Sequence, residues 1–241
     1  MNVVFIGPTL PDARHAANRD LIVRPPAVQG DVLRAVEDGA TAIGLVDGNF
    51  ENVAPVWHKE ILYALSQGVR VFGAASMGAL RAAECAAYGM VGLGEIYRQY
   101  AEGARVDDAD VALIHGPAEL GYLPLTLPLV NVDATLKRLL HSRALAPELI
   151  AALDATASAM FYKERNWAGI VAGVTLPAGI DAHRLVTLLA TEYVDQKRVD
   201  AEQLLDMLRR TPAQRTVVAQ SWKFNSTSMW KRLLSQPDAS S

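Results

Sequence analysis

Short apolar runs alternate with segments of helical periodicity in the first part of the chain. Four such runs end at glycine, proline or a polar turn, as buried strands do: residues 3–6, 21–23, 42–46 and 70–73. Helical spacing of apolar residues, or a run of good helix formers, marks residues 31–38, 56–67 and the alanine-rich segment that begins at Met77. This alternation predicts an α/β fold with a mostly parallel sheet and flanking helices, a Rossmann-like core.

The pattern changes along the second half of the chain. Residues 95–100 predict another helix, residues 111–115 a fifth strand, and residues 122–131 an extended segment whose prolines forbid a continuous helix. From residue 133 onward helical periodicity takes over, with helices expected over 133–143, 147–164, 181–192, 201–210 and 211–220. We therefore expect an α/β core over residues 1–132 and a helical region over residues 133–241 that packs on the core.

Composition and charge exclude several classes of protein. Half of the 241 residues are hydrophobic and a fifth are charged, which is ordinary for a globular protein. The net charge of −3 provides no field that favours nucleic acid, and no apolar run approaches the roughly 18 residues of a membrane span. The N-terminus lacks the features of a signal peptide. We expect a cytoplasmic protein with no nucleic-acid or membrane partner.

The residue types that commonly bind metals do not form a pattern that indicates a metal site. Cys85 is the single cysteine, which excludes an internal disulfide and a multi-cysteine zinc site, and its place in an alanine-rich helix predicts a small core residue. The five histidines do not have metal-ligand spacing. No glycine-rich loop has phosphate-binding spacing. We expect neither a metal nor a cofactor.

One polar side chain, Ser76, stands among small residues where a predicted strand meets a predicted helix. Gly73 and Gly78 allow a sharp turn and the close approach of a substrate. The helix that follows would direct its free N–H groups at whatever Ser76 attacks. The arrangement resembles a nucleophile elbow, although the first glycine lies three residues before the serine instead of two. Capping of the helix by Ser76 is the alternative.

Lys59 is a candidate base for Ser76. It lies at the start of the helix that precedes the Ser76 strand, and in a parallel sheet that end of the helix is near the edge where Ser76 should lie. A partly buried, neutral Lys59 could take the hydroxyl proton. His58 is another candidate base, and a Ser–His–Asp arrangement could combine Ser76 and Asp47 with either His58 or His115. A solvated Lys59 remains the simpler alternative.

Polar residues at other strand ends could assist. Asp47 and Asn49 follow a predicted strand and could orient the base or bind substrate, although Asp47 and the glycine after it could also simply build a turn. Asn131 follows an apolar run and could orient a catalytic group or cap the next helix.

Four segments of the chain resemble the TfuA-like family: residues 5–10, 47–50, 57–60 and 73–84. The resemblance extends through Val132. The part most specific to the family is the Ser76 segment, together with its position after Lys59 in the chain. It implies a partner of YcaO enzymes, which use ATP to activate peptide backbone amides so that sulfur replaces oxygen. It further implies hydrolysis of the thiocarboxylate terminus of a small ThiS-type sulfur carrier, with release of sulfide, and help for YcaO in engaging its precursor peptide.

The resemblance also implies a Ser–Lys site, which falls on Ser76 and Lys59. Ser76 would attack the thiocarboxylate carbonyl while Lys59 takes its proton, and the N–H groups of Met77 and Gly78 would form the oxyanion hole. Side chains that would steady the carrier tail or the anionic sulfur are Arg81 and Asn49. Two alternatives remain open. One is a non-catalytic adaptor between YcaO and its peptide, and the other is a Ser–Lys amidase or peptidase unrelated to sulfur.

Overall fold

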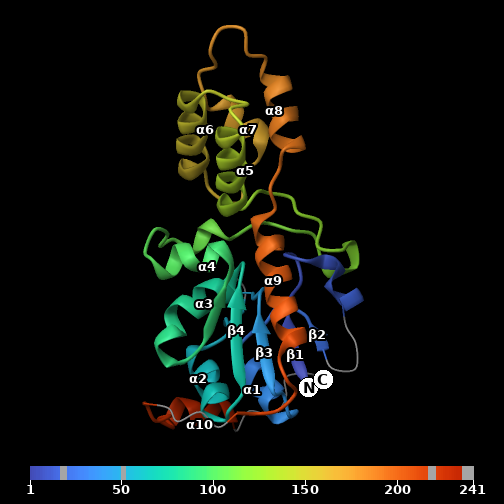
Figure 1. Ribbon diagram of the computed structural model, residues 1–241, viewed down its shortest axis with the longest axis vertical. Helices are drawn as coiled ribbons and strands as arrows, with labels where there is room; N and C mark the ends of the chain where they lie inside the picture. The colour runs from blue at the N-terminus through green and yellow to red at the C-terminus, as the bar shows by residue number, and fades with distance from the viewer. Residues whose placement is uncertain (17–20, 50–52, 217–220, 235–241) are drawn as a thin grey trace.

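The computed structural model describes residues 1–16, 21–49, 53–216 and 221–234. Its centre is one five-stranded, all-parallel sheet with the order β2-β1-β3-β4-β5 (Figure 1). The strands are β1 (Asn2–Phe5), β2 (Leu21–Arg24), β3 (Ala42–Leu45), β4 (Arg70–Ala74) and β5 (Val91–Leu93). The α/β fold with a mostly parallel sheet is confirmed.

Three helices that follow strands in sequence cover one face of the sheet: α1 (Asp31–Glu37), α2 (His58–Ser66) and α3 (Met77–Cys85). Side chains alternate between the two faces along each strand. Val3 and Phe5 of β1 therefore pack in the core with α1 and α2, whereas Val4 packs in the core on the opposite face.

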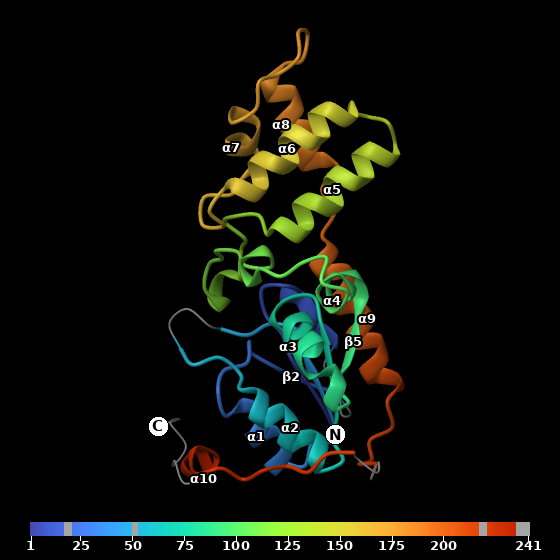
Figure 2. The same cartoon turned by 90° about the vertical axis from the view of Figure 1, so that its left-hand side faces the viewer.

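The opposite face is covered by a helix from the far end of the chain, α9 (Gln196–Arg210). Its leucines Leu204 and Leu208 lie against Gly44 of β3, where an added Cβ would come within 2.6 Å of Leu204 and 2.7 Å of Leu208. Figure 2 shows α9 on the side of the molecule away from α1 and α2. The first turn of α9 reaches the carboxyl edge of the sheet (Figure 1).

A separate apolar cluster forms a helical lobe beyond that edge (Figure 1). After α4 (Gly94–Ala101), the lobe consists of α5 (Leu129–His141), α6 (Pro147–Ala159), α7 (Trp167–Ala172) and α8 (Ala182–Thr191). The last helix, α10 (Ser228–Leu234), lies at the other end of the molecule, where Trp230 contacts Tyr63 of α2. No helix within the described ranges is long and apolar enough to cross a membrane.

The sequence predictions differ from the structure at several places. Helix α5 already begins at Leu129, inside the segment predicted to be extended, and α6 ends at Ala159 instead of residue 164. The fifth strand is residues 91–93, too short for a clear pattern, whereas residues 111–115 cross the carboxyl edge as an irregular segment with one isolated bridge, from His115 to Pro124. An apolar run predicts burial, but it does not distinguish a strand from a packed loop. Residues 211–216 are not helical, and residues 217–220 of that predicted helix lie outside the described residues. Helix α9 begins at Gln196, ahead of the predicted start at residue 201.

Candidate functional site

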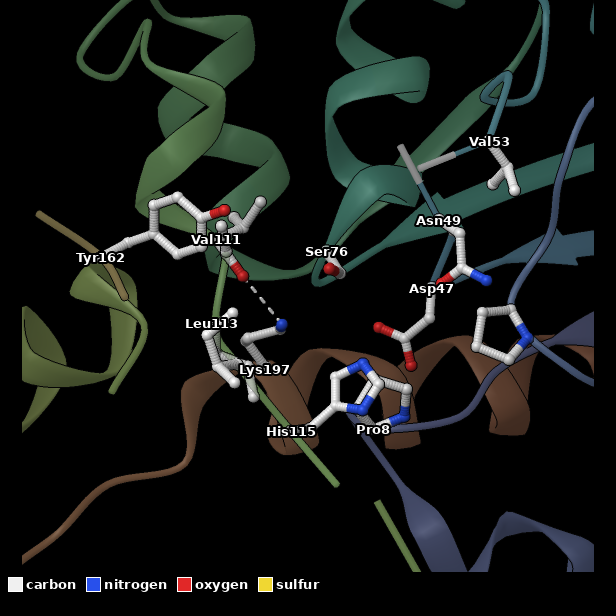
Figure 3. Close-up of a pocket in the computed structure, with 14 residues that line it drawn as sticks. Pro8, Asp47, Asn49, Val53, Ser76, Val111, Leu113, His115, Tyr162 and Lys197 are labelled. Atoms are coloured by element: carbon white, nitrogen blue, oxygen red, sulfur yellow. Dashed lines mark hydrogen bonds between the residues drawn. The ribbon is translucent and has the colours of Figure 1, made fainter. Parts of the chain in front are cut away.

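A cavity of about 330 Å³ opens at the carboxyl edge of the sheet. It lies where the strand order reverses between β1 and β3, so that the loops after these strands diverge. Side chains reach it from those two loops, from the β4–α3 turn, from residues 111–115, from α9 and from Tyr162 of the helical lobe (Figure 3). This is the place where doubly wound folds bind their ligands.

Ser76 enters the cavity from a strained turn. Ala75 has φ of 66°, which is unusual for a residue other than glycine, and the Ser76 N–H donates to the Ala74 carbonyl at 2.9 Å. Ser76 precedes α3 as its cap residue, yet its side chain makes no capping hydrogen bond. Its hydroxyl has no hydrogen-bond partner among the described residues, and it points into the cavity (Figure 3). The capping alternative therefore does not explain the Ser76 side chain.

The two predicted oxyanion donors differ. The Gly78 N–H already donates to the Val46 carbonyl at 3.0 Å, so it is not free to bind a substrate oxygen. A Cβ on Gly78 would lie 1.8 Å from the Leu45 carbonyl oxygen, so this glycine allows α3 to pack closely on β3. The Met77 N–H has no acceptor within the part of the chain that the structure describes. Of the two predicted donors, the Met77 N–H is the one without an acceptor among the described residues, and Met77 itself does not line the cavity.

A lysine that the sequence analysis missed, Lys197, lies in the same cavity as Ser76 (Figure 3). It belongs to the first turn of α9, is 3% exposed, and its Nζ donates to the Val111 carbonyl at 2.9 Å. Burial lowers the pKa of Lys197, and the nearby carboxylates of Asp47 and Asp195 oppose this shift. The lowered pKa favours the neutral amine, the form that can accept a proton.

Asp47 joins two of the loops that form the cavity. Its Oδ2 accepts hydrogen bonds from the Gly7 and Thr9 N–H groups, both at 2.9 Å, and its Oδ1 accepts one from the Thr9 hydroxyl at 2.5 Å. The carboxylate thus fixes the loop after β1 against the loop after β3. Asn49 lines the cavity from an exposed position, and its N–H donates to the Ala27 carbonyl at 3.1 Å.

Asn131 lies outside the cavity lining, in the first turn of α5, where it is buried. Its side-chain oxygen accepts the backbone N–H of Lys197 at 3.1 Å. Its amide nitrogen donates to the Tyr193 hydroxyl at 2.6 Å and to Asp195 Oδ1 at 3.0 Å. Asn131 therefore holds the start of α9, and with it Lys197, against the helical lobe.

The structure does not bring Lys59 to Ser76. Lys59 is absent from the cavity lining, and its Nζ lies 5.2 Å from the centroid of the Phe224 ring. The sheet topology places the start of α2 after the β3 strand end, as expected, but the Lys59 side chain faces the C-terminal segment. The lysine of the cavity is Lys197.

His58 and Arg81 also lie away from the cavity lining. Both contact Glu84 at the surface between α2 and α3, the His58 Nε2 and the Arg81 Nη1 each at 2.7 Å from Glu84 Oε2. They stabilise the contact between these helices. Within the described ranges no group of three histidine, cysteine or acidic side chains is placed to hold a metal.

The missed lysine does leave a sequence signal. The buried positions of α9 are residues 197, 200, 201, 204, 205 and 208, which have the spacing of one helix face. Lys197 and Asp200 therefore occupy positions where leucine would be expected. A charged side chain at a core position of an amphipathic helix indicates a buried, partnered group.

The fold and cavity define an α/β protein with a serine and a buried lysine at its topological switch point. The model of the TfuA-like protein family matches residues 47–166, and the chain belongs to this family, which is associated with YcaO-type thioamidation. The matched range contains Ser76 and ends before Lys197. No curated protein matches the chain.

Proposed function

We propose that this protein is a hydrolase that releases sulfide from the thiocarboxylated terminus of a ThiS-type sulfur carrier, to supply YcaO-dependent thioamidation. The observation that supports this proposal is that Ser76 and Lys197 line the same cavity. The hydroxyl of Ser76 has no partner among the described residues, and the amine of Lys197 is buried in the same cavity. The pair replaces the predicted pair of Ser76 and Lys59.

In the first half of the reaction, the Ser76 Oγ bonds to the thiocarboxylate carbonyl carbon while its proton passes to the neutral Lys197 amine. The carbonyl oxygen becomes an oxyanion, which the Met77 N–H can stabilise. The C–S bond then breaks as the Lys197 ammonium gives its proton to sulfur. The products are hydrosulfide and an ester between the carrier and Ser76.

In the second half, water hydrolyses this ester and releases the carrier with an ordinary carboxylate. The size of the cavity favours a thin carrier tail as the substrate, because a volume of about 330 Å³ admits a few small residues and no folded domain. Asn49 at the open side is placed to contact the tail. We propose that the released sulfide is used by YcaO on a precursor peptide in the cytoplasm, and that this protein also aids peptide engagement by YcaO.

Mass spectrometry of a thiocarboxylated ThiS-type carrier tests the proposal. We expect the protein to convert the thiocarboxylate to the carboxylate, with sulfide released in equal amount. Lys197→Met should slow conversion by about 10²- to 10⁴-fold, the usual contribution of a general base. Ser76→Ala removes the nucleophile and should slow conversion at least as much. Lys59→Met is the matched control and should convert the carrier at the wild-type rate.

Two outcomes favour the alternatives. A wild-type protein that leaves the carrier intact, with or without YcaO, would act as an adaptor, and thioamidation would then survive Ser76→Ala. Cleavage of simple amides with no action on the thiocarboxylate would favour a Ser–Lys amidase. Circular dichroism of each variant establishes that lost activity is not lost folding.

A further inference from the structure

A short arm carries a histidine over the carboxyl edge of the sheet and into the cavity. The Gly116 N–H donates to the Leu123 carbonyl and the Leu125 N–H to the Ile114 carbonyl, both at 2.8 Å. These bonds close residues 114–125 into a hairpin-like loop, with His115 bridged to Pro124 near its base. The half-buried His115 side chain lines the cavity together with Ser76 and Lys197.

The orientation of the His115 ring is fixed by two contacts. Its Nδ1 lies 2.7 Å from the Gly116 carbonyl oxygen, and the Tyr122 ring packs against it edge to face, with centroids 5.5 Å apart. A carbonyl oxygen only accepts hydrogen bonds, so Nδ1 must carry the hydrogen. In the neutral ring the other nitrogen, Nε2, has a free lone pair, and the His115 side chain lines the cavity that Asp47 also lines (Figure 3).

The cavity therefore holds two nitrogen bases, while formation of the ester uses one. Lys197 and His115 approach from different elements, α9 and the arm (Figure 3). Hydrolysis of the Ser76 ester needs a base for water, because water is a weak nucleophile near neutral pH. A neutral imidazole with its Nδ1–H held by a fixed acceptor is the usual form of such a base.

We propose that His115 is the general base of the second half-reaction. This assignment rests on the hydrolase function proposed above. Nε2 takes a proton from water as the water oxygen bonds to the ester carbonyl carbon. The C–Oγ bond of Ser76 then breaks, and the proton passes from Nε2 to Oγ. The products are the carrier carboxylic acid, which ionises, and the free Ser76 hydroxyl.

His115→Asn tests this assignment with little disturbance of the arm. The asparagine amide retains a donor for the Gly116 carbonyl, but it has no basic nitrogen. With thiocarboxylated carrier we expect one equivalent of sulfide per protein at the wild-type rate, followed by turnover slowed about 10²- to 10⁴-fold. Intact mass spectrometry should show the carrier ester on Ser76. His58→Asn is the matched control, because His58 pairs with Glu84 at the surface.

Hydroxylamine separates a chemical role from a structural one. It attacks esters without a general base, so it should release the accumulated carrier from His115→Asn. A slowed first equivalent of sulfide without accumulated ester would overturn the assignment of His115. Turnover of His115→Asn at the wild-type rate would also overturn it, but would leave the hydrolase function standing. Wild-type protein that releases no sulfide would instead defeat the hydrolase function itself.

Discussion

The two faces of the sheet are built from different parts of the sequence. On one face, α1, α2 and α3 each follow a neighbouring strand, so local connections place them. On the other face, α9 arrives only after the chain has formed the helical lobe and returned. The first face supplies Ser76, at the start of α3, and the second supplies Lys197, at the start of α9.

This difference separates two lysines that look equivalent in the sequence. Each lies in the first turn of a helix. Lys59 belongs to the locally built face, and its ammonium lies over Phe224. Lys197 belongs to the helix that covers the other face, and its amine is buried in the cavity that Ser76 also lines. The site is therefore complete only when distant parts of the chain have assembled.

The largest effect on stability is expected when one core residue from each face of the sheet is changed to alanine. Leu204 of α9 and Ile61 of α2 are both fully buried, so each change to alanine should reduce the free energy of unfolding by about 2–5 kcal/mol. Leu204→Ala should also slow sulfide release by the folded protein, because α9 positions Lys197. Ile61→Ala should not. Urea unfolding and sulfide release measured on folded samples check this, and equal loss of activity in both variants would contradict it.

Asn131→Ala tests the attachment of α9 to the helical lobe. The change leaves the buried Lys197 N–H without its acceptor, which should cost about 1–3 kcal/mol of stability. It should also slow sulfide release, because the first turn of α9 loses its anchor. Asn166→Ala is the control: Asn166 caps α7 inside the lobe, accepting from the Gly169 N–H at 2.9 Å, and its loss should cost about 1 kcal/mol. Slower sulfide release by Asn166→Ala would mean that the lobe as a whole, and not its anchor on α9, governs the site.

Local signals explain which parts could be predicted from the sequence. The first four strands and Ser76 are marked by short apolar runs and by small residues within a few positions of each other. The burial of Lys197 depends on contacts of α9 with a distant sheet, which no local pattern contains. The prediction of Lys59 as the base rests on the edge of the sheet near which its helix starts. That argument fixes the position of a helix terminus but not the direction of a side chain.

Asp47→Asn should change the pH dependence of sulfide release. The Asp47 carboxylate raises the pKa of Lys197 against the larger lowering by burial. Removing this charge lowers the pKa of Lys197 further, so the neutral amine forms at lower pH. The rise of the sulfide burst rate with pH should therefore shift to lower pH. Asp206→Asn, which changes an exposed carboxylate on α9 that pairs with Arg209, should give no shift. A shift to higher pH in Asp47→Asn would contradict the proposed effect of the Asp47 carboxylate on Lys197.

The smallest effect is expected from Lys59→Met, and it tests the comparison most directly. The variant keeps an apolar stem but removes the ammonium from the Phe224 ring, a contact worth about 0.5–1 kcal/mol at a partly exposed site. The midpoint temperature of thermal unfolding should fall by about 1–4 °C, because a loss of about 1 kcal/mol lowers the Tm of a domain of this size by a few degrees. Sulfide release should not change, because the Lys59 side chain does not line the cavity. If Lys59→Met instead lost sulfide release while its thermal stability stayed the same, the base would belong to the locally built face, and the buried amine of Lys197 would have only a structural role.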